Sequence, residues 1–217
     1  MAMRFDLSSC RALAVAFALL VPLETRSQSE PQLTASEEKD SYEIYSILLK
    51  TELPPQWKIT AWAITQETQS FPAYGASQDY SVEACLRISP EQESIYRPLF
   101  ADYRVKNQKA NILKRKFDLP EYALLTPGDV KAIQHRQRPV VRSSVEEHDH
   151  LVFPFNATVI FHVSAVGFNQ DRSRALVYAG HDCGSLCGGG RYHLMVKKDG
   201  QWQEDREFRG MSCAWMS

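Results

Sequence analysis

The sequence predicts an α+β fold in which a C-terminal antiparallel β-meander is covered by helices from the N-terminal and middle segments. Two observations predict this fold. Before about residue 135 apolar residues recur at helical spacing, whereas the last third consists of short strand-like runs separated by turn residues. Consecutive strands with short links form an antiparallel meander that must bury one face. We therefore expect the upstream helices to lie together on that face.

The first helix is expected over residues 36–50. Apolar residues recur there near helical spacing, and acidic residues fill the first turn, where the helix dipole favours them. Pro54 and Pro55 stop any continuation. Residues 57–65 then alternate and are rich in aromatic and β-branched side chains, so they predict a strand.

Further helices are expected in the middle of the chain. Ser89 and Pro90 form a good helix start, because serine can cap a helix and proline fits the first turn. Apolar residues keep a loosely helical spacing over residues 99–117, as a continuation beyond Pro98 or as a second helix. A threonine cap and another first-turn proline predict a short helix over residues 127–134.

The last third of the chain predicts the meander. Its strand-like runs are residues 158–164, 175–179, 192–197 and 202–207. The turns between them are residues 169–171, a glycine-rich segment at 184–190, and residues 198–200. Asp199-Gly200 between two alternating runs is among the better local hairpin signals.

The N-terminus has the layout of a signal peptide. Arg4 and Arg11 precede a twelve-residue apolar run, Ala12–Leu23. That run is shorter than the about 20 residues that a membrane-spanning helix needs. We expect cleavage between Ser27 and Gln28, and hence export to the periplasm or secretion, with no transmembrane segment left after processing.

The remaining chain predicts one domain. Residues 1–27 are interpreted as the signal peptide, residues 28–35 as a flexible leader, and residues 36–217 as a single α+β domain of ample length for one core. With 25 basic and 26 acidic side chains the protein is nearly neutral, which argues against nucleic acid as a partner.

The charge is uneven along the chain. Residues 28–103 hold 5 basic and 12 acidic side chains, whereas residues 104–142 hold 10 and 3. The basic stretch is either a patch for an anionic partner or a complement that neutralises the acidic stretch across the fold. We favour neutralisation.

Cys183 and Cys187 lie in the most distinctive segment, His181–Gly190. An even number of cysteines, four of the five, remains after processing, which favours disulfides in an exported chain. We expect a local Cys183–Cys187 disulfide that closes a tight turn and stabilises it modestly. Two alternatives stay open: a zinc site completed by His181 or His193, and a redox dithiol with one residue more than the usual spacing. The pairing of the other cysteines is left open.

Other candidate sites are weaker. Residues 146–150 (Glu-Glu-His-Asp-His) are interpreted as a solvated loop, because adjacent side chains on an extended chain point apart and do not converge on a metal. His162 lies within an apolar run and is expected to be hydrogen-bonded or at an edge. Trp57 and the other tryptophans either line a glycan or peptide groove or anchor the core, and Trp202 looks like core.

Several runs resemble a recurring block in uncharacterised exported bacterial proteins. They are Val163-Ser-Ala-Val-Gly-Phe-Asn169, Ala175-Leu-Val-Tyr178, Cys183-Gly-Ser-Leu-Cys-Gly188 and Trp202, with weaker likeness at residues 43–49, 65–68 and 103–107. The resemblance implies a bacterial exported domain. It implies no activity, ligand or catalytic residue.

Two classes of function remain open. No Gly-x-Ser-x-Gly and no His-Glu-x-x-His sequence occurs. We expect no cofactor and no metal, and a non-catalytic binding or envelope-associated domain with a protein or glycan partner. The alternative is an extracytoplasmic hydrolase whose catalytic residues are far apart in sequence.

Overall fold

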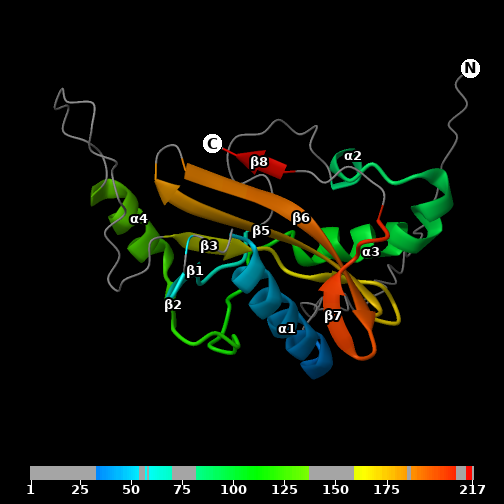
Figure 1. The fold of residues 1–217 in the computed structure, drawn as a ribbon, viewed down its shortest axis with the longest axis horizontal. Helices are drawn as coiled ribbons and strands as arrows, with labels where there is room; N and C mark the ends of the chain where they lie inside the picture. The colour runs from blue at the N-terminus through cyan, green and yellow to red at the C-terminus, as the bar shows by residue number, and fades with distance from the viewer. Residues whose placement is uncertain are drawn as a thin grey trace, which may run out of the picture. The chain divides into compact units, whose positions relative to one another are not determined.

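A mixed β-sheet with helices on both faces forms the core of the protein in the computed structural model (Figure 1). The structure describes residues 33–53, 57, 59–69, 82–136, 159–184, 187–208 and 214–216. Within them the sheet has eight strands in the order β2-β1-β3-β5-β6-β7, with β4 paired to β5 and β8 to β6. The strands are β1 Trp62–Thr65, β2 Tyr122–Leu125, β3 Ile160–Val163, β4 Gly167–Phe168, β5 Arg174–Gly184, β6 Cys187–Lys198, β7 Gln201–Glu204 and β8 Ala214–Met216.

The C-terminal strands form the predicted antiparallel run. β3 pairs with β5, β5 with β6, and β6 with β7, all antiparallel. The turn between β6 and β7 is the predicted Asp-Gly turn, in which Asp199 (φ 50°) and Gly200 (φ 79°) both adopt left-handed backbone angles. The fold is therefore α+β, as the period of the sequence predicts.

A parallel edge extends this sheet. β1 pairs in parallel with both β2 and β3. Neither parallel pairing is predicted from the sequence, and β1 is shorter than the expected strand at residues 57–65. β2 lies in the middle segment that was expected to be mainly helical. Its four residues are too few to show a period, so only its partner β1 identifies it as a strand.

The helices agree in part with those expected, since the first and the last begin within one residue of the expected start and end one or two residues later, whereas the short helix at residues 82–85 is not predicted. They are α1 Ala35–Thr51, α2 Val82–Cys85, the 3₁₀ helix η2 Pro90–Gln92, α3 Glu93–Lys106 and α4 Pro127–Arg136. Thr34 and Glu37 form a capping box at the start of α1. α3 continues through Pro98 but stops at Asn107, so the expectation of helix up to residue 117 is wrong. The Asn107 side chain donates to the carbonyl of Tyr103 and forms two hydrogen bonds with the backbone of Ala165. These bonds attach the end of α3 to the segment between β3 and β4.

The helices cover both faces of the sheet, and the expectation of one covered face is wrong. Leu48 of α1 packs in a cluster with Val177 and Met195, whereas Phe100 of α3 packs with Leu176 on the opposite face. α4 covers β1 and β3 at a further small cluster. Every residue from Ala175 to Ala179 is at most 3% exposed, since both faces of β5 are buried. A strand buried on both sides is apolar throughout, so its sequence does not reveal a second covered face.

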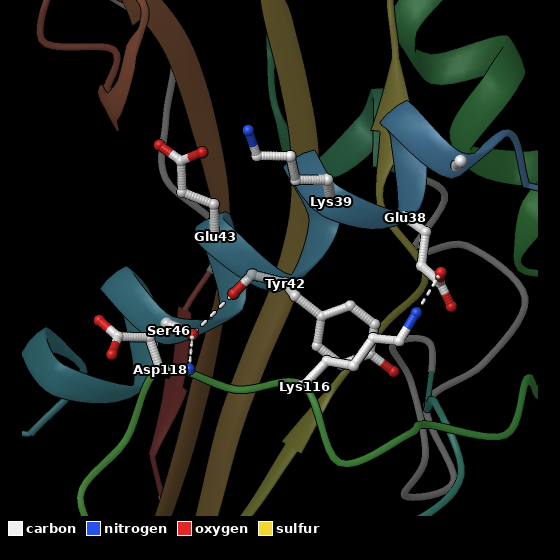
Figure 2. A pocket seen from close by; sticks show the side chains of 8 residues that line it. Glu38, Lys39, Tyr42, Glu43, Ser46, Lys116 and Asp118 are labelled. Carbon is white, nitrogen blue, oxygen red and sulfur yellow. Dashed lines mark hydrogen bonds and ion pairs between the residues drawn. The ribbon is translucent and has the colours of Figure 1, made fainter.

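Three lysines of the basic stretch pair with carboxylates of the acidic stretch. Glu38 of α1 forms ion pairs with Lys114 and Lys116, and Lys106 lies 2.8 Å from both Glu37 and Asp102 (Figure 2 shows Lys116 reaching Glu38). α1 and the segment after α3 therefore supply the opposite charges that the sequence separates. These pairs are of the kind expected if the two stretches neutralise each other.

Residues 33–217 form one compact unit. The predicted signal peptide and most of the predicted leader lie outside the described residues, and α1 begins one residue before the expected domain boundary. In the part of the chain that the structure describes, no helix is both long and apolar enough to cross a bilayer.

Candidate functional site

The block around Val163–Asn169 docks α3 and closes a turn. A Cβ on Gly167 would lie 2.6 Å from the Cα of Tyr103, so only glycine allows α3 to approach β4 this closely. The next residue, Phe168, donates its backbone N–H to Asp102 at 2.7 Å. Asn169 accepts from the N–H of Arg174 across the β4–β5 turn. These contacts give the residues structural roles in the fold.

Cys183 and Cys187 form a disulfide at the tip of the β5–β6 hairpin. Their Cα atoms are 5.0 Å apart, and Gly184, with a φ of 137°, provides a backbone conformation that other residues rarely adopt. Both sulfurs are used, so neither a zinc site nor a free dithiol is formed by this pair. Cys85 is also disulfide-bonded, and its partner lies outside the described residues.

Five ionisable side chains meet where α1 ends over β5, β6 and β7. We call them the α1-end cluster: Glu52, His181, Arg191, His193 and Glu204. Glu52 caps the C-terminus of α1, and its side chain is 5% exposed. Its Oε2 lies 3.0 Å from His193 Nε2 and 3.9 Å from Arg191 Nε, and its Oε1 lies 4.0 Å from His181 Nδ1. The other ring nitrogen, His193 Nδ1, lies 2.8 Å from Glu204 Oε1.

Strand geometry brings the cluster together. Alternate residues of a strand share a face, so Arg191 and His193 both point towards α1. The register pairs β5 and β6 so that His181 projects from the same face. Trp57 packs edge-on against His181, with ring centres 6.4 Å apart, and remains 41% exposed.

The charges of the cluster compensate one another. A carboxylate at a helix C-terminus is opposed by the helix dipole, so Glu52 requires the cations Arg191 and His193. Burial alone would lower the pKa of His193, but its hydrogen bonds to Glu204 and Glu52 outweigh burial and raise the pKa. Burial lowers the pKa of His181 although the charge of Glu52 opposes this shift. His193 therefore stays protonated to higher pH than an ordinary histidine, and His181 stays neutral to lower pH.

The geometry of His193 limits its chemistry. A histidine that acts as a general base needs one ring nitrogen within reach of the proton that it removes. In His193 each ring nitrogen faces a carboxylate instead. His193 therefore attaches the end of α1 to β6 and β7 and has no ring nitrogen left for a nucleophile, whereas Nδ1 of His181 makes no hydrogen bond within the described residues.

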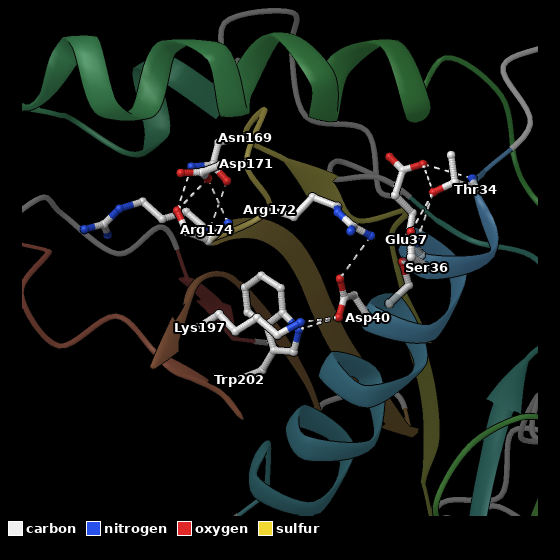
Figure 3. A network of polar contacts seen from close by, with 12 residues as sticks. Thr34, Ser36, Glu37, Asp40, Asn169, Asp171, Arg172, Arg174, Lys197 and Trp202 are labelled. Carbon is white, nitrogen blue, oxygen red and sulfur yellow. Dashed lines mark hydrogen bonds and ion pairs between the residues drawn. The ribbon is translucent and has the colours of Figure 1, made fainter. Parts of the chain in front are cut away.

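A second buried carboxylate holds the other end of α1. Asp40, whose side chain is 7% exposed, accepts hydrogen bonds from Lys197 Nζ (2.7 Å) and Trp202 Nε1 (3.1 Å). Figure 3 shows these two side chains converging on Asp40 while Arg172 approaches from the β4–β5 turn, its Nη1 3.6 Å from Asp40 Oδ2. Asp40 and Glu52 thus fix α1 to β6 and β7 at both ends.

The remaining candidates from the sequence do not converge on a site. His162 lies in β3 between β1 and β5, not at an edge, and burial together with repulsion from His181 lowers its pKa to about 4. Trp202 is core, at 3% exposure. Residues 146–150 lie outside the described residues. Among the residues that the structure describes, no group of three or more histidine, cysteine, aspartate or glutamate side chains is placed to hold a metal ion.

Two hollows lie away from the α1-end cluster. A pocket of about 410 Å³ lies between α1 and residues 116–118 (Figure 2), where the backbone N–H of Asp118 donates to Ser46. A second pocket, of about 480 Å³, lies beyond the ends of β1 and β2 beside α4. Neither includes a residue of the α1-end cluster.

Sequence reasoning found only part of the cluster. His181 and His193 were candidates because of the nearby cysteines, whereas Glu52, Arg191 and Glu204 carry no local signal. The alternation of Arg191 and His193 within β6 was available as a hint that they share a face. Comparisons with protein-family models, with curated proteins and with solved structures found no match for this chain.

Proposed function

We propose that the chain is an exported, non-catalytic binding domain that meets a partner outside the cytoplasm, at the bacterial envelope or beyond it. The short apolar run behind Arg4 and Arg11 supports export. The disulfide-bonded state of Cys85, Cys183 and Cys187 supports an oxidising compartment. The resemblance of the Val163–Asn169 block to exported bacterial proteins points the same way.

One observation carries the non-catalytic assignment. Both nitrogens of His193 are occupied by carboxylates, Glu52 and Glu204, in the cluster that would otherwise be the best catalytic candidate. The second buried carboxylate, Asp40, is likewise engaged with Lys197 and Trp202. These buried charges hold α1 on the sheet, and a rigid scaffold of this kind serves binding by limiting the entropy lost on association.

Histidine NMR combined with hydrolysis assays tests this assignment. Long-range ¹H–¹⁵N spectra should show His193 as an imidazolium protonated at both nitrogens above the pH at which an ordinary histidine loses its proton. Chromogenic ester, glycoside and peptide substrates should be hydrolysed no faster by the wild type than by His193→Gln. Hydrolysis that is lost in His193→Gln and Glu52→Gln but kept in the control Glu43→Gln would establish the hydrolase instead.

Export has its own test. Mass spectrometry of protein from a bacterial host should find a mature N-terminus between about residues 25 and 31. A cytoplasmic protein that retains Met1 would contradict export and leave the assignment of the cluster unaffected.

A further inference from the structure

The second pocket is a half-open hollow large enough to hold a small molecule. It lies beyond the carboxyl ends of the parallel strands β1 and β2, where α4 begins (Figure 1 shows these three elements at one end of the sheet). Its volume, about 480 Å³, is within the range that holds small ligands. It is lined by Thr65, Glu67, Gln69, Leu125, Pro127, Val130 and Lys131.

The walls of this pocket are fixed by backbone hydrogen bonds. The N–H of Gln66 donates to the carbonyl of Leu125 at 2.7 Å, and the N–H of Gln69 donates to that of Val163 at 2.8 Å. Thr126 and Asp129 cap the start of α4 reciprocally. A ligand would therefore enter a site whose backbone is already ordered, which lowers the entropic cost of binding.

Of the polar side chains that line the pocket, Thr65 donates its hydroxyl to the carbonyl of Glu67 at 3.1 Å, and Lys131 is exposed. Within the described residues, no hydrogen bond or ion pair engages the side chains of Glu67, Gln69 or Lys131. The pocket beside α1 differs, because Lys116 is paired there with Glu38 and Asp118 with Lys50. The second pocket thus offers one carboxylate, one ammonium group and one amide next to the apolar side chains of Leu125 and Val130.

We propose that this pocket binds a small zwitterion, specifically a free α-amino acid with an apolar side chain. Glu67 would receive the α-ammonium group, Lys131 the α-carboxylate, and Leu125, Pro127 and Val130 the side chain. The charges of Glu67 and Lys131 cancel, so a ligand with both charges satisfies both groups, whereas a simple anion or cation leaves one of them opposed. The inference rests on the proposed function, since it names what such a binding domain takes up.

Isothermal titration calorimetry with L-leucine tests the pocket. The disulfide-bonded mature protein should bind L-leucine, and Glu67→Gln and Lys131→Gln should each weaken binding by about tenfold, as expected for a charge-assisted hydrogen bond. N-acetyl-leucine, which lacks the ammonium charge, should bind the wild type weakly and Glu67→Gln no more weakly. Leucinamide, which lacks the carboxylate charge, should bind the wild type weakly and should bind Lys131→Gln no more weakly.

The matched control variants are Glu43→Gln and Lys116→Gln, which remove the same charges at the pocket beside α1 and should bind L-leucine like the wild type. Circular dichroism checks that every variant is folded. The proposal is overturned if no standard amino acid binds at millimolar concentration, if Glu67→Gln and Lys131→Gln bind like the wild type, or if glucose binds equally well.

The recovered ligand separates this proposal from the proposed function. Unchanged L-leucine after incubation supports both. A chemically altered ligand would refute the non-catalytic function and leave the pocket assignment standing. Absence of binding would refute the pocket and leave a non-catalytic domain with a different partner.

Discussion

Replacing Gly167 by alanine should separate α3 from the sheet. A Cβ at this position would lie 2.6 Å from the Cα and Cβ of Tyr103 and 2.7 Å from its backbone N. Because ordinary contacts begin near 3.4 Å and a backbone cannot rotate away as a flexible side chain can, α3 must move by about 0.8 Å or more.

The cost of this movement follows from what holds α3 in place. Overpacking of a core contact costs about 1–3 kcal/mol. The displacement also stretches the hydrogen bond from Phe168 to Asp102 and the two between Asn107 and Ala165, each of which contributes about 1 kcal/mol. We expect a loss of about 3 kcal/mol, which lowers the Tm of a domain of this size by about 6–12 °C.

Thermal and urea unfolding of Gly167→Ala, followed by tryptophan fluorescence, measure the loss. The control is Gly128→Ala, whose new Cβ meets only Thr126 Oγ1 at 3.6 Å in the first turn of α4. Since alanine favours a helix over glycine by up to about 1 kcal/mol, the control should be as stable as the wild type or slightly more stable. A Gly167→Ala protein with the Tm of the wild type would show that the close approach of α3 and β4 is not a constraint.

Two further predictions concern buried ionisable groups. Glu52→Gln should destabilise the protein by about 3 kcal/mol, because it leaves His193 and Arg191 without their buried anion. The same substitution should lower the pKa of His193 in an NMR titration. The control Glu43→Gln should change neither the stability nor this pKa. A wild-type level of stability in Glu52→Gln would contradict the role of the cluster. Burial lowers the pKa of His162 from 6.5 to about 4, so this side chain is protonated more readily in the unfolded chain than in the folded one. The free energy of unfolding should therefore be at its full value above pH 6.5 and should fall by roughly 3 kcal/mol between pH 6.5 and 4. Urea unfolding over this pH range should show a smaller loss for His162→Gln than for the wild type, and equal losses would refute the assignment.

The helix starts and the hairpin were predictable because their signals are local. The capping residue Thr126 lies next to the helix that it begins, and Asp199-Gly200 adopts the left-handed angles that its turn requires. The Cys183–Cys187 pair was favoured for the same reason, since the two residues are close in sequence and flanked by glycine. In each case the interacting residues are within a few positions of one another.

The α1-end cluster was not predictable, because its members come from separate elements. Glu52 meets His193 across 141 positions of the chain, and nothing in the residues around Glu52 marks it as buried. The end of α3 at Asn107 was not predicted for a similar reason. The Asn107 side chain forms hydrogen bonds with the backbone of Ala165, which lies far away in the sequence.

By itself, the sequence determined that the fold is α+β, that a run of antiparallel strands ends the chain, where the first and last helices begin and how the Asp199-Gly200 turn is built. Those features depend on the backbone preferences and the spacing of neighbouring residues. The glycine-rich turn expected at residues 184–190 is wrong, because Gly184 belongs to β5 and residues 187–190 belong to β6. Only the tertiary structure decided that β1 joins β2 and β3 in parallel, that helices cover both faces, and that Glu52, His193 and Glu204 meet. These arrangements depend on contacts between distant segments, and many different contacts are compatible with the same local pattern.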